Sequence, residues 1–143
     1  MTTTGTTKMP RPQPMPGRDS APFWDGAARG ELLGQRCADC GLFRHPPRPM
    51  CPACQSVKTE WVQLTGRGKV AAHMRPVHPR IPMFDYPLVC VLVDLDEGIR
   101  LFSNLYECEP ERVENGMEVE VFFVPTAGDK QVPVFRPVQG GRS

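Results

Sequence analysis

The stretch CADCGLFRHPPRPMCPAC, residues 37–54, decides the fold of this chain of 143 residues. It contains two Cys-x2-Cys pairs, Cys37 with Cys40 and Cys51 with Cys54, and ten residues separate the pairs. Two such pairs can place four thiolates at the corners of a tetrahedron, the arrangement that Zn²⁺ takes with sulfur ligands at about 2.3 Å. The spacing therefore predicts a metal site whose ligands are Cys37, Cys40, Cys51 and Cys54.

A bound metal would supply much of the stability of this segment. Between the pairs, the only sizeable apolar residues are Leu42, Phe43 and Met50, too few for the segment to fold by burial alone. Structural zinc contributes on the order of 10 kcal/mol or more to such segments. Four sulfur ligands leave no coordination position for water, so we expect a structural and not a catalytic ion. Iron can occupy the same sulfurs, and zinc is the favoured interpretation.

From Trp61 onward the sequence changes to the alternating pattern of β-strands. Strand patterns cover residues 69–75, 88–95, 99–106, 118–124 and 132–138. In the first of these, alternation places Val70, Ala72 and Met74 on one face. Residues 96–98 (Asp-Glu-Gly) predict a tight turn, and residues 110–116 predict at most one helical turn. Five strands of this length favour a small closed barrel such as an OB-fold, so the predicted fold class is mainly β.

The chain divides into five parts. The Pro- and Thr-rich residues 1–22 bury too little apolar area to offset ordering entropy and are expected to form a disordered tail. Residues 23–35 are expected to be helical, as one short amphipathic helix or a broken pair, weakened by glycines. The metal-binding ribbon is expected at residues 36–60, the barrel at 61–138 and a second disordered tail at 139–143.

Composition and charge narrow the class of protein. The formal net charge is +1 and the chain has six cysteines. Its longest apolar run, residues 88–93, is far shorter than the ~20 residues of a membrane span, and the N-terminus lacks the apolar core of a signal peptide. We therefore expect a cytoplasmic protein with no membrane partner, whose cysteines are thiols or metal ligands and not a disulfide framework. Basic residues outnumber acidic ones in residues 29–80, and the reverse holds in residues 81–143.

No sequence motif for catalysis stands out. Gly66 and Gly68 neither follow a strand nor open a helix, so we interpret them as a turn or bulge into the first barrel strand, with a backbone site for a ligand phosphate as the alternative. The sequence places no orienting carboxylate beside His45, His73 or His78. We therefore expect no catalytic residue in this chain.

In their order and spacing, the motifs resemble those of the acyl-CoA-associated zinc-ribbon/OB-fold proteins, known as domain-of-unknown-function family 35. The resemblance runs from about Phe23 to Pro137. It rests on FWDGAARGEL, CADCG, PPRPMCPAC, Trp61, GRGKV, YPLVCVLVDLDEG, SNL, NGMEVEV and VFRP. It implies an N-terminal helical hairpin, a rubredoxin-like zinc ribbon and a C-terminal five-stranded OB-fold barrel.

The resemblance also implies a function. Members of this family are typically not enzymes alone but accessory subunits that dock on an enzyme and help to form its acyl-CoA channel. The partner is a thiolase-like enzyme, such as a lipid-transfer-type thiolase acting as an aldolase on steroid side chains, or a hot-dog enoyl-CoA hydratase. The resemblance therefore implies a non-catalytic subunit in lipid, steroid side-chain or related acyl-CoA metabolism, in a heterotetramer with acyl-CoA at the interface.

Two groups of side chains are candidates for these contacts. Basic residues on and near the proline-rich loop between the first two barrel strands could hold the phosphates of CoA; they are Arg48, Arg67, Lys69, Arg75 and Arg80. Large apolar residues of that loop and of the helical segment either pack onto the chain itself or form a partner interface or channel wall; they are Phe23, Trp24, Ile81, Met83, Phe84 and Tyr86.

Two other functions stay open. Zinc ribbons and OB-folds also bind single-stranded nucleic acid, and Phe102 and Tyr106 lie on the polar face of a middle strand, where bases would stack. Against this, the pI of about 7.6 is below that of typical nucleic-acid-binding domains, so a nucleic-acid partner is not expected. An independent acyl-CoA enzyme would need a group that activates water, and Asp85 with His78 is the only candidate pair.

Overall fold

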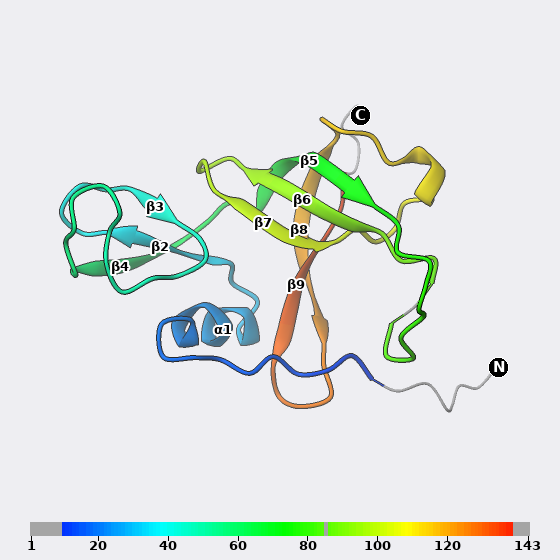
Figure 1. Cartoon of the computed structure of the whole chain (residues 1–143), viewed down its shortest axis with the longest axis horizontal. Coiled ribbons are helices and arrows are strands. Elements are labelled where there is room, and N and C mark those ends of the chain that lie inside the picture. Colours follow the sequence, from blue (N-terminus) through cyan, green and yellow to red (C-terminus); the bar gives the residue numbers. More distant parts are fainter. Residues whose placement is uncertain (1–9, 85, 139–143) are drawn as a thin grey trace.

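The computed structural model describes residues 10–84 and 86–138 of the chain. Figure 1 shows a small sheet and a larger curled sheet side by side, with a short helix next to both. The tail predictions for residues 1–9 and 139–143, and the suggestion of Asp85 as a catalytic group, lie outside the described residues. Within residues 10–84 and 86–138, no helix has the length and apolar character needed to cross a membrane.

The small sheet is the ribbon. It consists of β2 (Leu33–Cys37), β3 (Phe43–Arg44) and β4 (Thr59–Gln63) in the order β3-β2-β4. Strands β2 and β4 are antiparallel over five residue pairs, from Leu33 opposite Gln63 to Cys37 opposite Thr59. Strand β4 therefore crosses the domain boundary expected at residue 60, and Trp61 packs against the core from the ribbon side.

The large sheet is a five-stranded barrel. Its strands are β5 (Arg67–Met74), β6 (Cys90–Leu95), β7 (Arg100–Asn104), β8 (Glu118–Pro125) and β9 (Gln131–Pro137), in the order β7-β6-β5-β8-β9. A parallel bridge between Leu105 and Phe135 joins the two ends of this order and closes the barrel. The connectivity is that of a Greek-key OB-fold, which confirms the predicted mainly β fold.

The strand pattern is right for most of the barrel but wrong at the end of β5. Val70, Val93 and Val119 are 2% exposed or less, as alternation requires. Met74, predicted to share the face of Val70, is 54% exposed. The cause is an irregularity in the pairing of β5 with β6 between Val70 and Ala72. A β-bulge inserts one unpaired residue and so shifts the strand's inward face by one position.

The described chain has one α-helix, α1 (Ala21–Ala28), and not the helical hairpin implied by the family resemblance. The helix ends in a Schellman arrangement, in which the N–H of Glu31 donates to the carbonyl of Gly26 and that of Gly30 to Ala27. Gly30 has a φ of 78°, a conformation that suits glycine and stops the helix. Residues 33–35, also expected to be helical, lie instead in β2.

The barrel completes the end of this helix. The side-chain amide of Gln131 in β9 donates to the carbonyls of Ala27 and Ala28 at 3.0 and 3.3 Å. These carbonyls are among the last four of the helix, for which the helix itself supplies no N–H donor. Within the helix, the side chains of Phe23 and Ala27 are buried. Helix and barrel therefore share one packed core.

The segment before the helix also departs from the expectation of a disordered tail. Residues 21–22 belong to α1. From Pro10 the chain lies against the barrel, and the carbonyl of Arg11 accepts a hydrogen bond of 2.8 Å from the N–H of Ala127. The composition argument fails here because the segment is held by polar contacts to the barrel, and not by burial of its own apolar side chains.

Candidate metal centre and binding surfaces

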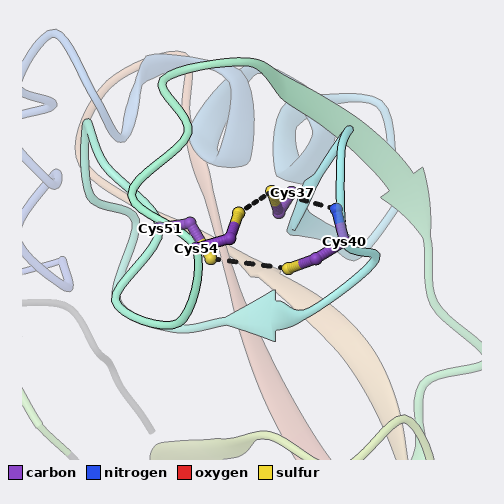
Figure 2. A group of neighbouring side chains, drawn as sticks. All are labelled: Cys37, Cys40, Cys51 and Cys54. Carbon is purple, nitrogen blue, oxygen red and sulfur yellow. Dashed lines mark hydrogen bonds between the residues drawn. The ribbon is translucent and has the colours of Figure 1, made fainter.

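The four cysteines of the two Cys-x2-Cys pairs converge at one end of the ribbon (Figure 2). The Sγ atoms of Cys37 and Cys54 are 3.5 Å apart, and those of Cys40 and Cys51 are 3.6 Å apart. All four sulfurs lie within 4.8 Å of one another. A tetrahedron with metal–sulfur bonds of about 2.3 Å has edges of about 3.8 Å, so the cluster has the size of a four-sulfur metal site.

The backbone of the two pairs explains this convergence. In each pair the residue after the second cysteine donates its N–H to the carbonyl of the first, from Gly41 to Cys37 and from Gln55 to Cys51, both at 2.9 Å. Gly41 and Gln55 both have positive φ, of 81° and 65°. These equivalent turns place the two cysteines of each pair on the same side of the loop.

The same turns polarise the cysteine thiols. The N–H of Cys40 donates to the Sγ of Cys37 at 3.4 Å, and this lowers the pKa of Cys37 to about 6. The backbone N–H of Cys54 lowers the pKa of Cys51 in the same way. The N–H of Ser56 lowers the pKa of Cys54, but the three neighbouring cysteine sulfurs and burial together outweigh it, and the pKa of Cys54 is raised to about 12.

These observations fit a structural metal. A cation that binds thiolates supplies the charge needed to deprotonate Cys54 beside Cys37. Cys37 and Cys51 are fully buried, whereas Cys40 and Cys54 are exposed, so the ion would lie at the edge of the ribbon. The chain therefore contains a four-cysteine site suited to bind a metal, as the spacing predicted.

A buried polar network fixes the loop between the two pairs. The amide of Gln35, which is 5% exposed, exchanges two hydrogen bonds of 2.8 and 2.9 Å with the backbone of Arg48. The buried guanidinium of Arg44 donates to the same Arg48 carbonyl and to the hydroxyl of Thr59. The backbone of Arg48 is thus part of the ribbon's scaffold, whereas its side chain is exposed.

The five predicted basic residues do not form one surface. Arg75 and Arg80 lie together on the loop between β5 and β6, where they line a cavity of about 330 Å³ with Tyr86. The Arg80 guanidinium lies 5.0 Å from the centroid of the Tyr86 ring, and Arg75 approaches Glu111 at 3.5 Å. Arg67 faces Glu120 at 3.6 Å on the barrel wall.

Lys69 and Arg48 lie apart from the pair on the loop. Lys69 is opposite Asp94 and Glu118 in the sheet register. Arg48 belongs to the loop between the cysteine pairs. The sequence could not separate these groups, because residues distant in the chain and close in space supply the acidic neighbours.

The predicted apolar residues fall into two groups. Phe23 is 5% exposed and stacks edge-on against Trp24 at 4.9 Å, with the His45 ring 5.4 Å away. It therefore packs on the ribbon. The others are less buried, and Ile81 is 41% exposed. Tyr86 orders its loop by accepting a hydrogen bond of 2.9 Å from the N–H of Ile81.

The structure also forms a cavity that sequence reasoning missed. It has a volume of about 380 Å³ and lies where the helix, the ribbon loop and the barrel meet. Its lining includes Trp24, His45, Phe102 and Arg11. Burial lowers the pKa of His45, which favours its neutral form. No local signal marks this cavity, because its walls come from five separate stretches of the chain.

Comparison with known proteins agrees with this two-part architecture. Residues 24–59 match the family described as "ChsH2, rubredoxin-like zinc ribbon domain", and residues 61–124 match "ChsH2, C-terminal OB-fold domain". The chain is similar to a DUF35 domain-containing scaffold protein of Methanocaldococcus jannaschii, with 35% identity over 76% of this chain and 82% of the relative.

Two further relatives have names that include an activity. A probable enoyl-CoA hydratase alpha subunit of Thermomonospora curvata is 40% identical over 89% of this chain, which spans only 40% of that longer protein. The solved structure named "Ltp2-ChsH2(DUF35) aldolase" is 39% identical, covers 87% of this chain and 98% of that one, and superposes with a TM-score of 0.84. The chain therefore belongs to the ChsH2/DUF35 family of proteins, which join a rubredoxin-like zinc ribbon to an OB-fold.

Proposed function

We propose that this chain is a non-catalytic accessory subunit of an acyl-CoA enzyme. The observation that carries the proposal is the match, over nearly the whole folded part, to the DUF35 chain of an aldolase named for two components. The hydratase alpha-subunit name of a second relative and the scaffold name of a third fit the same role.

The metal site supports a structural role. A site with four protein sulfurs has no open position for substrate or water, so its ion would hold the ribbon together and would not take part in the reaction. Zinc is the ion that we propose, and iron is the competitor. Elemental analysis of the purified chain is expected to give about one zinc per chain. A sample with two disulfides and no metal, or a coloured iron-loaded sample, contradicts the zinc assignment.

The partner that we propose is a thiolase-like aldolase subunit or a hot-dog enoyl-CoA hydratase, joined to this chain in a heterotetramer with acyl-CoA at the interface. The surface proposed for docking is the loop between β5 and β6 together with Trp24. In that loop Ile81 is the most exposed of the predicted apolar residues, and Met83, Phe84 and Tyr86 are half-buried. These side chains remain partly exposed to water in the folded chain, so burying them against a second protein would stabilise a complex.

Arg75 and Arg80 are the residues that we propose for the phosphates of CoA. They share one cavity at the edge of the docking loop, so a phosphate there would be close to the proposed partner. Arg67, Lys69 and Arg48 remain weaker proposals, because none of them belongs to the lining of this cavity.

Co-expression tests the proposal. The chain is produced with a thiolase-like or hydratase subunit encoded beside it, and the sample is analysed by size-exclusion chromatography with light scattering. A stable complex is expected, whose acyl-CoA turnover falls when this chain is omitted. A partner that is soluble and fully active alone, with no complex eluting, contradicts the proposal. Turnover of acyl-CoA by this chain alone contradicts its non-catalytic role.

A further inference from the structure

The segment 10–16 crosses the face on which OB-folds generally hold their ligands. That face is formed by the second and third strands and by the loops after the first and the fourth strands, which here are β6, β7, loop 75–89 and loop 126–130. In Figure 1 the dark blue segment crosses the β8–β9 hairpin near its loop and extends toward the green loop between β5 and β6.

Arg11 contacts two of these parts through its side chain. Its Nη2 donates to the Oδ1 of Asn104 at 2.9 Å and to the hydroxyl of Tyr106 at 3.0 Å, both at the end of β7. Its guanidinium carbon lies 5.0 Å from the centroid of the Phe84 ring, which belongs to loop 75–89. One side chain thus bridges a barrel strand and the long loop.

The backbone of the segment contacts the third part. The N–H of Ala127, in the loop between β8 and β9, donates to the carbonyl of Arg11 at 2.8 Å. The side chain of Gln13 lies so close to Gly128 that a Cβ at that position would overlap with it. Met15, by contrast, is 93% exposed, so the large apolar side chain of the segment contributes little to its attachment.

We infer that residues 10–16 form an intramolecular strap that crosses the ligand face of the OB-fold and covers the part around Tyr106, and that Arg11 is the residue that holds it there. These contacts of Arg11 have two consequences. It occupies the hydroxyl of Tyr106 on this face, and it holds the loop between β5 and β6 against the barrel through Phe84. Release of Arg11 would therefore free both the strap and the loop, although the two are far apart in sequence.

Arginine is suited to this position in a way that lysine is not. Its planar guanidinium can lie over an aromatic ring while its edge donates to two acceptors, whereas an ammonium offers a point charge on a flexible stem. Arg11→Lys is therefore expected to give a partial release and Arg11→Ala a full one.

Amide hydrogen exchange, measured by NMR on the metal-loaded full chain, tests the inference. The informative amides are those of Ala127 and Phe84. Ala127 donates to the backbone carbonyl of residue 11, which Arg11→Ala retains, so faster exchange there reports lifting of the strap and not the loss of the substituted side chain. Two side-chain hydrogen bonds and a cation–π contact are lost, so exchange at both amides is expected to accelerate about tenfold or more.

Arg18→Ala is the matched control, because it removes the same charge from an exposed position between the strap and α1. It is expected to leave both amides unchanged, and amides of the ribbon strands are expected to stay unchanged in every variant. The inference is overturned if Arg11→Ala leaves Ala127 and Phe84 within about twofold of the wild-type exchange rate. It is also overturned if all amides accelerate together, which would make Arg11 a residue of general stability. If Arg11→Ala does not fold, Arg11→Lys decides between the same outcomes.

Discussion

In the ribbon, some residues supply sulfur atoms to the four-cysteine site, and others hold the surrounding loops by hydrogen bonds. The sulfurs define the site, and backbone N–H groups directed at Cys37 and Cys51 lower the pKa of both thiols. Gln35 and Arg44 hold the intervening loop by its backbone. The ribbon is therefore built around polar and sulfur contacts, because its sequence offers few apolar side chains for a core.

Cys40→Ser is expected to abolish stoichiometric metal binding, because a serine hydroxyl is a poor ligand for a cation held by thiolates. The ribbon strands should then lose protection, while the barrel keeps its own core. Metal analysis and amide exchange measure the two effects. Cys108→Ser, which lies outside the cluster, should retain the metal. Full metal content in Cys40→Ser would show that the ion is held elsewhere.

The pKa of His45 gives a prediction for pH dependence. Burial lowers this pKa from its ordinary value of 6.5. As the pH falls, the unfolded chain therefore takes up this proton before the folded chain does, and stability decreases below about pH 6.5 and not above it. An NMR titration of the His45 ring in the folded chain should give a midpoint below 6.5. A midpoint at or above that value would place His45 in a solvated or carboxylate-paired setting.

Secondary-structure elements are completed here by contacts from other elements. Helix α1 has only eight residues and no side-chain hydrogen bond at its N-terminal cap. Isolated helices of this length are unstable in water. It is stable in the folded chain because its own Phe23 and Ala27 are buried and because Gln131 of β9 donates hydrogen bonds to its last carbonyls.

Gln131→Ala is expected to lower the free energy of unfolding by about 1 kcal/mol, since it removes hydrogen bonds to partly buried carbonyls. Chemical denaturation measures this change. Gln63→Ala, at the exposed end of β4, is the control and should change stability by less than about 0.5 kcal/mol. If both substitutions change the free energy of unfolding equally, the hydrogen bonds from Gln131 to the helix do not contribute to stability.

On the scale of the whole molecule, the basic residues of the sequence divide into separate surfaces, and one of them adjoins the proposed docking loop. Arg75 and Arg80 share a cavity there. The strap of residues 10–16 covers the neighbouring ligand face of the barrel. The cavity leads us to expect that CoA binds beside the docking loop. The covered face leads us to expect that nucleic acid does not bind.

Arg80→Ala in the assembled complex is expected to raise the KM for acyl-CoA by up to about fivefold, the effect of one exposed charged contact, with little change in kcat. Arg75→Ala should act similarly. Steady-state kinetics of the complex measure the effect, and Arg100→Ala, an exposed arginine that pairs with Asp94, serves as the control. An unchanged KM in both loop variants would remove these arginines from the CoA proposal.

A single-stranded oligonucleotide is expected not to bind the full chain. Phe102 is 62% exposed, but the Tyr106 ring stacks edge-on against Phe122 at 5.7 Å and its hydroxyl is bonded to Arg11. The face therefore offers one free aromatic ring in place of a stacking platform. Fluorescence anisotropy with labelled oligothymidine measures binding. Micromolar affinity that falls steeply with salt would favour the nucleic-acid function instead.

The sequence by itself determined the features that depend on neighbours in the chain. The four-cysteine cluster follows from the spacing of Cys37, Cys40, Cys51 and Cys54. Four of the strands follow from alternation, and the strand within residues 88–95 follows from a run that is apolar on both faces. It was wrong about Met74, because a bulge is a property of two paired strands. The single short helix left open by the sequence is observed, whereas the helical hairpin implied by the resemblance is wrong, because glycine at position 30 ends the helix and pairing with β4 places residues 33–35 in a strand.

The tertiary structure alone decided the features that need distant segments to meet. Arg11 binds residues more than 90 positions away in the sequence, and Gln131 caps a helix from a similar distance. The partners of Arg67 and Arg75 also come from distant parts of the chain, Glu120 from β8 and Glu111 from the 3-10 turn Pro110–Arg112. Periodicity and spacing report which face of an element is apolar, but they do not report which polar groups the folded chain brings to that face.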